Sequence, residues 1–117
     1  MTDSKEPLLD QSVLDSLLGS VEPAAMPVLM QSLEREIGDS EAGILETAGK
    51  LDWALLEVKA HALKSATASF GAMRLSALLL LMEENARETQ DAVVLSQQCS
   101  DLTALVCETR EVFGWSK

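Results

Sequence analysis

Apolar residues recur three and four positions apart along most of the chain, a spacing that places them on one face of an α-helix. Near the end of the chain, for example, Leu95, Cys99, Leu102, Leu105 and Val106 keep this spacing. The pattern stops at glycines and prolines, the residues that most often delimit helices. It predicts five helices, at residues 10–18, from between 22 and 27 to 49, 51–70, from 71 to about 88, and 91–114 with the caps included.

The predicted helix ends depend on particular residues. Pro27 is acceptable only in a first turn, so the second helix has to begin near it. Gly38 and Gly43 are weak points in what the spacing indicates is one long helix. Asp91 is a suitable N-cap for the last helix, and Gly114 a suitable stop. Four long amphipathic helices with short connections predict an all-α, antiparallel four-helix bundle with a short additional N-terminal helix at one end.

The composition favours the same fold class and a single domain over residues 1–117. Hydrophobic residues make up 47% of the chain and aromatic residues only 3%. Leucine and alanine favour helices, whereas the β-branched and aromatic residues that strands favour are scarce. We expect residues 1–8 to form a loose tail, residues 77–82 to be the buried centre of the fourth helix, and Trp53 and Trp115 to pack at helix ends.

The formal net charge of −10 narrows the range of partners. Such a surface repels phosphates, so we expect binding neither to nucleic acids nor to anionic membranes. The apolar run at residues 77–82 is far shorter than the ~20 residues that a bilayer requires. The first residues lack the basic and apolar segments of a signal peptide. A cytoplasmic location is therefore expected.

The two cysteines, Cys99 and Cys107, are expected on one helix. Eight residues of helical rise separate them by about 12 Å, which exceeds the reach of a disulfide. We expect two reduced, partly buried thiols and no metal site, because further ligands are missing.

The single histidine, His61, lies in the third predicted helix. At about 100° per residue, the apolar stripe of that helix centres roughly 130° away from it. The stripe consists of Leu51, Leu55, Ala62, Ala66 and Phe70. The residues within about 40° of His61 are Ala54, Glu57, Ser65 and Ala68. His61 is therefore expected to face solvent among mostly small side chains.

An accessible neutral imidazole carries a lone pair on one ring nitrogen, and that nitrogen can act as a nucleophile toward phosphorus. Lys64 lies one helical turn away from His61, about 60° around the helix axis. Its ammonium can approach an anion attached to the ring. The pair predicts a site where a phosphoryl group could be received and partly neutralised.

The segment HALKSATASFGAMRL at residues 61–75 resembles the core pattern of the histidine-phosphotransfer domain family. In that pattern a histidine is followed by any residue, then by a leucine, a lysine and either glycine or serine. A short run of small residues comes next and ends near a glycine, and a further leucine lies beyond it. The matching residues are His61, Leu63, Lys64, Ser65, Ala66, Ala68, Phe70, Gly71 and Leu75. The chain is similar above all to the monomeric members that serve bacterial quorum-sensing phosphorelays, whose length and helix order it shares.

The resemblance implies a role for each matching residue. His61 would carry the phosphoryl group on its distal ring nitrogen, and Lys64 would help to neutralise it. Ser65 stands where many relatives have glycine and would permit close approach, as would the small Ala68. Gly71 would let the third and fourth helices meet closely. The chain would act as a phosphocarrier, with no enzyme activity of its own.

The resemblance also implies the partners. The receiver domain of a hybrid sensor kinase would donate the phosphoryl group, and the receiver domain of a response regulator would accept it. The receiver would supply the aspartate and Mg²⁺, so the chain needs no cofactor and is expected to be a monomer. The candidate docking residues are Ala54, Glu57, Lys59, Met73 and Arg74.

Two other functions remain open. The chain could be a non-catalytic helical adaptor in which His61 is incidental. It could also be a di-iron enzyme, although such bundles need two Glu-x-x-His motifs and Glu57 lies four residues before the only histidine. The further carboxylates of the fourth helix, Glu83, Glu84 and Glu88, are expected on a solvated face.

Overall fold

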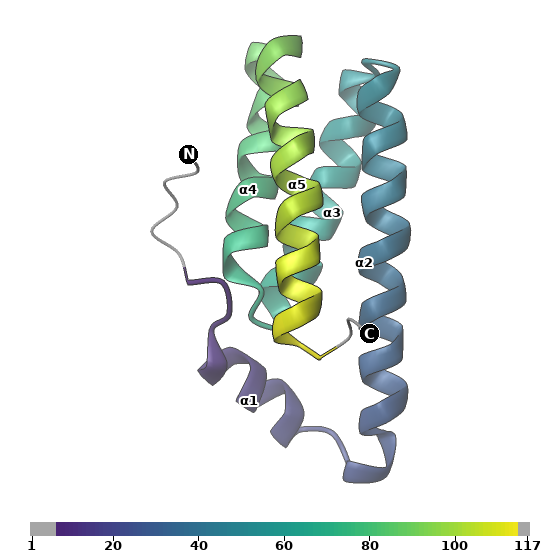
Figure 1. Cartoon of the computed structure of the whole chain (residues 1–117), viewed down its shortest axis with the longest axis vertical. Helices are drawn as coiled ribbons and strands as arrows, with labels where there is room; N and C mark the ends of the chain where they lie inside the picture. Colours follow the sequence, from purple (N-terminus) through teal and green to yellow (C-terminus); the bar gives the residue numbers. More distant parts are fainter. Residues whose placement is uncertain (1–6, 115–117) are drawn as a thin grey trace.

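The computed structural model describes residues 7–114, and these contain helices but no β-strand. The elements are α1 (Gln11–Gly19), the short 3₁₀-helix η1 (Pro23–Ala25), α2 (Met26–Gly49), α3 (Trp53–Ser69), α4 (Met73–Glu84), the single π-helical turn η2 (Asn85–Thr89) and α5 (Ala92–Val112). The four long helices run alternately up and down, while α1 lies across one end of the bundle (Figure 1). The predicted fold class is confirmed.

Aspartate side chains begin three of the helices. Asp10 accepts hydrogen bonds from the backbone N–H groups of Ser12 and Val13, and Asp52 accepts one from Leu55. Asp91 accepts from the second and third residues of α5, at 2.9 and 3.1 Å, as its predicted role as N-cap requires. These bonds satisfy N–H groups that have no partner within a helix, so they define where each helix starts.

α2 is one uninterrupted helix of 24 residues, although it contains Gly38 and Gly43. Pro27 is its second residue, where a missing N–H costs nothing. Gly43 faces the side chain of Lys59 on α3: a Cβ added at this glycine would lie 3.2 Å from the Lys59 ammonium nitrogen. The glycine therefore gives that long side chain room to lie across α2.

The core is aliphatic and draws residues from all four long helices. Its fully buried side chains include Ile37, Ile44, Leu56, Leu63, Leu75, Leu79, Met82 and Leu102. Burial of each such side chain contributes about 1.5–3 kcal/mol. One aromatic pair closes the end nearest α1: Phe70 and Phe113 meet edge to face, with ring centroids 5.6 Å apart.

The predicted core face of the third helix is wrong by about 90° of rotation. Leu51, Leu55 and Ala62 are exposed. The residues that face the core from α3 and its C-cap are Leu56, Ala60, Leu63, Thr67 and Phe70. Thr67 can be buried because its hydroxyl donates to the carbonyl of Leu63 at 2.9 Å.

Two details of the fourth helix also differ from the prediction. Only part of the apolar run at residues 77–82 is buried, because Leu80 and Leu81 face solvent. The α-helix ends at Glu84, and the chain continues to Thr89 as the π-helical turn η2. In a π turn each backbone hydrogen bond spans five residues, one more than in an α-helix. The side chains that follow therefore point in a different direction around the helix axis.

Gly71 joins α3 to α4 and also holds α1 in place. Its φ of +90° is readily adopted only by glycine, and a Cβ there would lie 2.6 Å from the backbone oxygen of Asp10. The Gly71 carbonyl in turn accepts a hydrogen bond from the Asp10 N–H at 2.7 Å. The turn and the start of α1 therefore touch through their backbones.

The expected tail lies mostly outside the described residues, and so does Trp115. Leu8 differs from the expectation, because it is half-buried and packs against the core. Trp53 also packs partly buried against the core, at the start of α3.

No single helix within residues 7–114 is long and apolar enough to cross a membrane. Residues 11–49 pass that test only as a pair of helices joined across a bend of 112°.

Cys99 and Cys107 are both free thiols. Cys99 is half-buried as expected, and burial raises the pKa of its thiol. Cys107 differs from the expectation because it is exposed.

Candidate functional site

His61 projects from the middle of α3 on the side turned away from the core. Its side chain is 59% exposed. The core residues of α3 centre about 140° from it around the helix axis, so the predicted exposure is correct although the predicted stripe was not. Ala54 and Ser65, the predicted neighbours on its face, are exposed as well, and Ala68 is half-buried. The small side chains leave the outer edge of the ring accessible.

One ring nitrogen of His61 is occupied by a carboxylate from the neighbouring helix. Nδ1 lies 2.9 Å from Oε2 of Glu83 on α4. An ionised carboxylate can only accept hydrogen bonds, so Nδ1 has to carry the proton and donate it. In the neutral ring, the lone pair then belongs to Nε2, the nitrogen farther from the backbone. This arrangement leaves Nε2 as the nucleophilic atom.

Glu83 is buried, with only 8% of its side chain exposed, and it is surrounded by cations. Lys64 Nζ lies 2.8 Å from Oε1, and Arg87 Nη1 lies 3.6 Å from Oε2. The bond from Lys64 lowers the pKa of the Glu83 carboxyl below its ordinary value; burial opposes this shift, and the bond from His61 supports it. Glu83 therefore remains ionised at neutral pH, as a buried but well-paired charge.

We refer to His61, Glu57, Lys64, Glu83 and Arg87 together as the His61 cluster. Arg87 links its two carboxylates, since its Nη1 also lies 3.9 Å from Oε2 of Glu57. Three cationic or potentially cationic groups thus meet two carboxylates on the surface shared by α3, α4 and η2. Lys64 was predicted from the sequence, and Arg87 was not. Glu83 was expected on a solvated face, and this prediction is wrong because the carboxylate is buried where α4 packs against α3.

Tight packing between α3 and α4 holds the cluster together. The hydroxyl of Ser76 on α4 donates to the backbone carbonyl of Lys64 at 3.1 Å. Ala60 on α3 and Ala72 before α4 are completely buried. Small residues at such positions let two helices approach closely, and this brings the Glu83 carboxylate within reach of the histidine ring.

Arg87 is directed into the cluster by η2, which Asn85 fixes to α5. The Asn85 amide donates to the carbonyl of Asp91 at 3.1 Å and to Oε1 of Gln98 at 3.2 Å, while its Oδ1 accepts from the N–H of Asp91 at 2.9 Å. Asn85 and Gln98 are both buried. These hydrogen bonds hold the π turn against α5. The turn in turn holds Arg87, four residues after Glu83, beside the Glu83 carboxylate.

The predicted docking residues do not form one group. Ala54 is exposed near His61, and Glu57 belongs to the cluster. Lys59 reaches toward α2, where it lines a pocket of about 250 Å³ with Asp39, Ser40, Gly43 and Ala62. Met73 and Arg74 are half-buried at the start of α4, roughly 15 Å of helical rise from Glu83. Gly71 lies in the turn and holds α1, so it acts at a distance from the ring.

Two exposed aliphatic side chains near His61 are absent from the docking residues predicted from the sequence. Val58, one turn before His61, is 64% exposed, and Leu80, one turn before Glu83, is 40% exposed. Helical geometry places each about 60° around its axis from the cluster residue, on the side away from the core. Val58 lies three residues before His61, and this spacing places it on the exposed side of the same helix. Leu80 stands within a continuous apolar run, so the sequence does not distinguish it from the buried residues beside it.

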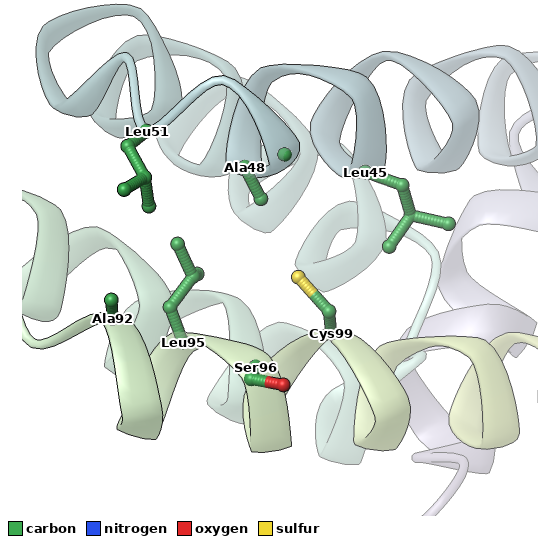
Figure 2. A pocket seen from close by; sticks show the side chains of 8 residues that line it. Leu45, Ala48, Leu51, Ala92, Leu95, Ser96 and Cys99 are labelled. Atoms are coloured by element: carbon green, nitrogen blue, oxygen red, sulfur yellow. The ribbon is translucent and has the colours of Figure 1, made fainter.

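A separate apolar pocket of about 300 Å³ lies between α2 and α5 (Figure 2). Figure 2 shows Leu45, Ala48 and Leu51 facing Leu95 and Cys99 across it. Apart from Ser96 and the Cys99 thiol, its lining side chains are aliphatic. It shares no residue with the His61 cluster.

Among residues 7–114, no three His, Cys, Asp or Glu side chains are arranged to hold a metal ion. The chemistry available to the cluster is that of an oriented imidazole, a buried carboxylate and two permanent cations. Comparisons with protein-family models, with curated proteins and with solved structures give no match to this chain.

Proposed function

We propose that this protein is a phosphocarrier of the histidine-phosphotransfer type, in which Nε2 of His61 takes a phosphoryl group from a phosphoaspartate and passes it to another aspartate. One observation carries this proposal. Nδ1 of His61 is bonded to the buried Glu83 carboxylate, and this leaves the nucleophilic nitrogen on an open, mostly small-residue surface.

The proposed transfer is a displacement at phosphorus. The Nε2 lone pair attacks the phosphorus atom, and an N–P bond forms while the P–O bond to the partner's aspartate breaks. The aspartate departs as a carboxylate with that bond's electron pair. Delivery to the second partner is the same exchange in reverse, with the new aspartate as the attacking group.

Lys64 supports the proposal as a cation one helical turn from His61 that keeps some access to solvent. Its side chain is 24% exposed, and its ammonium is held 2.8 Å from Glu83, one turn from His61. A bound phosphoryl group adds close to two negative charges to a chain whose net charge is already −10. A nearby ammonium offsets this repulsion where it is greatest.

The chemistry requires a partner that supplies the activated phosphoryl group. The chain contains no glycine-rich nucleotide-binding loop, so the donor would be a receiver domain that provides the aspartyl phosphate and Mg²⁺. Val58 and Leu80 with the exposed Ala54 would offer an apolar contact surface beside His61. We propose a hybrid sensor kinase and a response regulator as the two partners, in a cytoplasmic quorum-sensing phosphorelay with this chain as a monomer.

The test is transfer of a radiolabelled phosphoryl group from a phosphorylated receiver domain in the presence of Mg²⁺. We expect label on His61 that is labile in acid and stable in alkali, as phosphohistidine is. The control is His61→Gln, which should show unchanged helicity by circular dichroism and no label. Absence of label with several receiver domains, or label on another residue, would contradict the proposal. An adaptor function would instead leave partner binding and cellular phenotype unchanged in His61→Gln.

A further inference from the structure

Glu83 occupies the side of the His61 ring that faces the bundle. It comes from α4, it is nearly inaccessible to solvent, and its Oε2 lies 2.9 Å from Nδ1. A partner that approaches Nε2 from solvent therefore cannot displace it. Its contact with the ring persists while chemistry proceeds on the opposite nitrogen.

We infer that Glu83 is the positioning residue of His61, holding the proton on Nδ1 both when Nε2 takes up a phosphoryl group and when it releases one. This inference rests on the proposed phosphocarrier function. It deepens that function because it assigns control of the phosphoryl group's lifetime to a residue that the partner never touches.

During uptake, the Nδ1 proton does not move. The neutral ring attacks with its Nε2 lone pair, so no base has to remove a proton from the attacking nitrogen. After the N–P bond has formed, the ring bears a positive charge and still carries the Nδ1 proton. The Glu83 carboxylate faces that charge directly and stabilises it.

During release, the retained proton makes the ring a good leaving group. The N–P bond breaks, its electron pair returns to Nε2, and the ring departs as neutral imidazole. Without the Nδ1 proton the ring would have to depart as an imidazolate anion, which is a far poorer leaving group. Glu83 thus keeps the phosphohistidine ready for transfer, at the expense of its lifetime in water.

Glu83 also competes with the phosphoryl group for cations. Lys64 and Arg87 both approach its carboxylate, at 2.8 and 3.6 Å. Because the carboxylate is buried, withdrawing both cations from it would leave the positively charged ring as its only ion-pair partner in the His61 cluster. The cations are therefore shared between Glu83 and the phosphoryl group, which limits how firmly they hold the latter.

Glu57 is less suited to this role, although it also belongs to the cluster. It lies on the same helix as His61 and contacts Arg87 at a distance of 3.9 Å. Its side chain is more exposed than that of Glu83, so solvent weakens its electrostatic effect. The buried carboxylate that contacts the ring directly is Glu83.

The inference is tested with Glu83→Gln in the full chain, with Glu84→Gln as the matched control. Both substitutions remove one negative charge from α4, but Glu84 lies outside the His61 cluster. Each protein is phosphorylated with phosphoramidate, a small-molecule donor that requires no partner, and also by a phosphorylated receiver domain. Hydrolysis of the phosphohistidine is then followed at neutral pH. ¹⁵N NMR of the unphosphorylated proteins reports which ring nitrogen of His61 carries the proton.

For Glu83→Gln we expect phosphorylation to slow by about tenfold, because a neutral amide oxygen accepts a weaker hydrogen bond from Nδ1 than a carboxylate does and can be exchanged for the amide's NH₂ group. We also expect its phosphohistidine to survive severalfold longer than that of the unaltered chain. Loss of local structure alone would slow uptake without prolonging that lifetime. Glu84→Gln should match the unaltered chain in both rates. NMR should show the proton on Nδ1 in the unaltered chain and a larger share on Nε2 in Glu83→Gln.

Equal uptake and hydrolysis rates for Glu83→Gln and the unaltered chain would overturn the inference and leave the proposed function intact. If no donor phosphorylates His61, the proposed function fails, and the NMR spectrum still decides where the proton lies. A proton on Nε2 in the unaltered chain would overturn the inference in every case. That measurement requires no variant, so it holds even if Glu83→Gln does not fold.

Discussion

The hydroxyl of Ser76 on α4 donates a hydrogen bond to the backbone carbonyl of Lys64 on α3, with 3.1 Å between the two oxygens. The same carbonyl accepts a bond from the Thr67 hydroxyl, also at 3.1 Å. Lys64 is thus fixed through its backbone as well as through its ammonium. The two helices that carry His61 and Glu83 are thus joined about one turn from His61 on α3 and two turns from Glu83 on α4.

Replacement of Ser76 by alanine should weaken this connection. We expect the free energy of unfolding to fall by about 0.5–1.5 kcal/mol, as for the loss of one buried hydrogen bond. Urea denaturation measures the change. Ser100→Ala, at an exposed position of α5, is the control and should change the value by less than about 0.5 kcal/mol. Equal effects of the two substitutions would show that the Ser76 bond contributes nothing specific.

Two glycines should respond to alanine in opposite directions. At Gly71 the φ of +90° and the oxygen of Asp10, 2.6 Å from an added Cβ, predict a loss of at least about 1–2 kcal/mol in the free energy of unfolding. At Gly38, inside α2, an added Cβ meets no atom within 4 Å, so the better helix former should stabilise the chain by about 0.5–1 kcal/mol. Thermal unfolding of the two variants checks both signs, and a stabilising Gly71→Ala would contradict the backbone contact between the turn and α1.

The pair of Lys64 and Glu83 should be energetically coupled. Lys64→Met keeps most of the side chain but removes the ammonium beside a buried carboxylate, so we expect a loss of about 1–3 kcal/mol in the free energy of unfolding. Combining it with Glu83→Gln should cost less than the sum of the two single changes, by about 0.5–3 kcal/mol. A double-mutant cycle in urea measures this coupling.

The control cycle uses Lys50→Met and Glu46→Gln, an exposed pair on and just after α2 at 3.5 Å. Its coupling should not exceed about 0.5 kcal/mol, because solvent screens exposed pairs. Should the two cycles give the same coupling, burial of Glu83 would have no part in the strength of its ion pair.

The stabilising effect of Glu83 should disappear in acid. The bond from Lys64 lowers the pKa of the carboxyl in the folded chain, so its ionised form favours folding. This contribution is complete above the unfolded-state value of about 4.5 and is lost as the pH falls through the lower folded-state value. The difference in unfolding free energy between the unaltered chain and Glu83→Gln should therefore shrink as the pH falls below about 4.5. A difference that grows as the pH falls below 4.5 would contradict the assigned direction.

The sequence predicted the features that depend on local chemistry. Asp91 and Gly49 mark helix ends through capping and backbone freedom, and both lie where expected. The prediction that His61 is exposed was also correct. Both the predicted and the observed core face of α3 lie more than about 120° from His61 around the helix axis, so the ring faces solvent in either case. These features require only the spacing of residues within one helix.

The features that were missed depend on contacts between helices. Thr67 and Ala60 carry too little apolar surface to stand out in a sequence, yet they face the core because α4 approaches closely there. The acidic residues around Glu83 are typical of a solvated helix face, and only the packing of α4 against α3 shows that Glu83 meets His61, 22 residues earlier in the chain. The π turn that directs Arg87 follows from the bonds of Asn85 to α5, which no periodicity reveals.

The different surroundings of the two cysteines provide a practical handle. The reactive form of a cysteine is its thiolate, and the raised pKa of the half-buried Cys99 suppresses that form. Cys107 is exposed on α5, a helix that contributes no side chain to the His61 cluster. A maleimide fluorophore should therefore attach to Cys107 first, which labels the chain at a place that leaves the side chains of the His61 cluster unmodified.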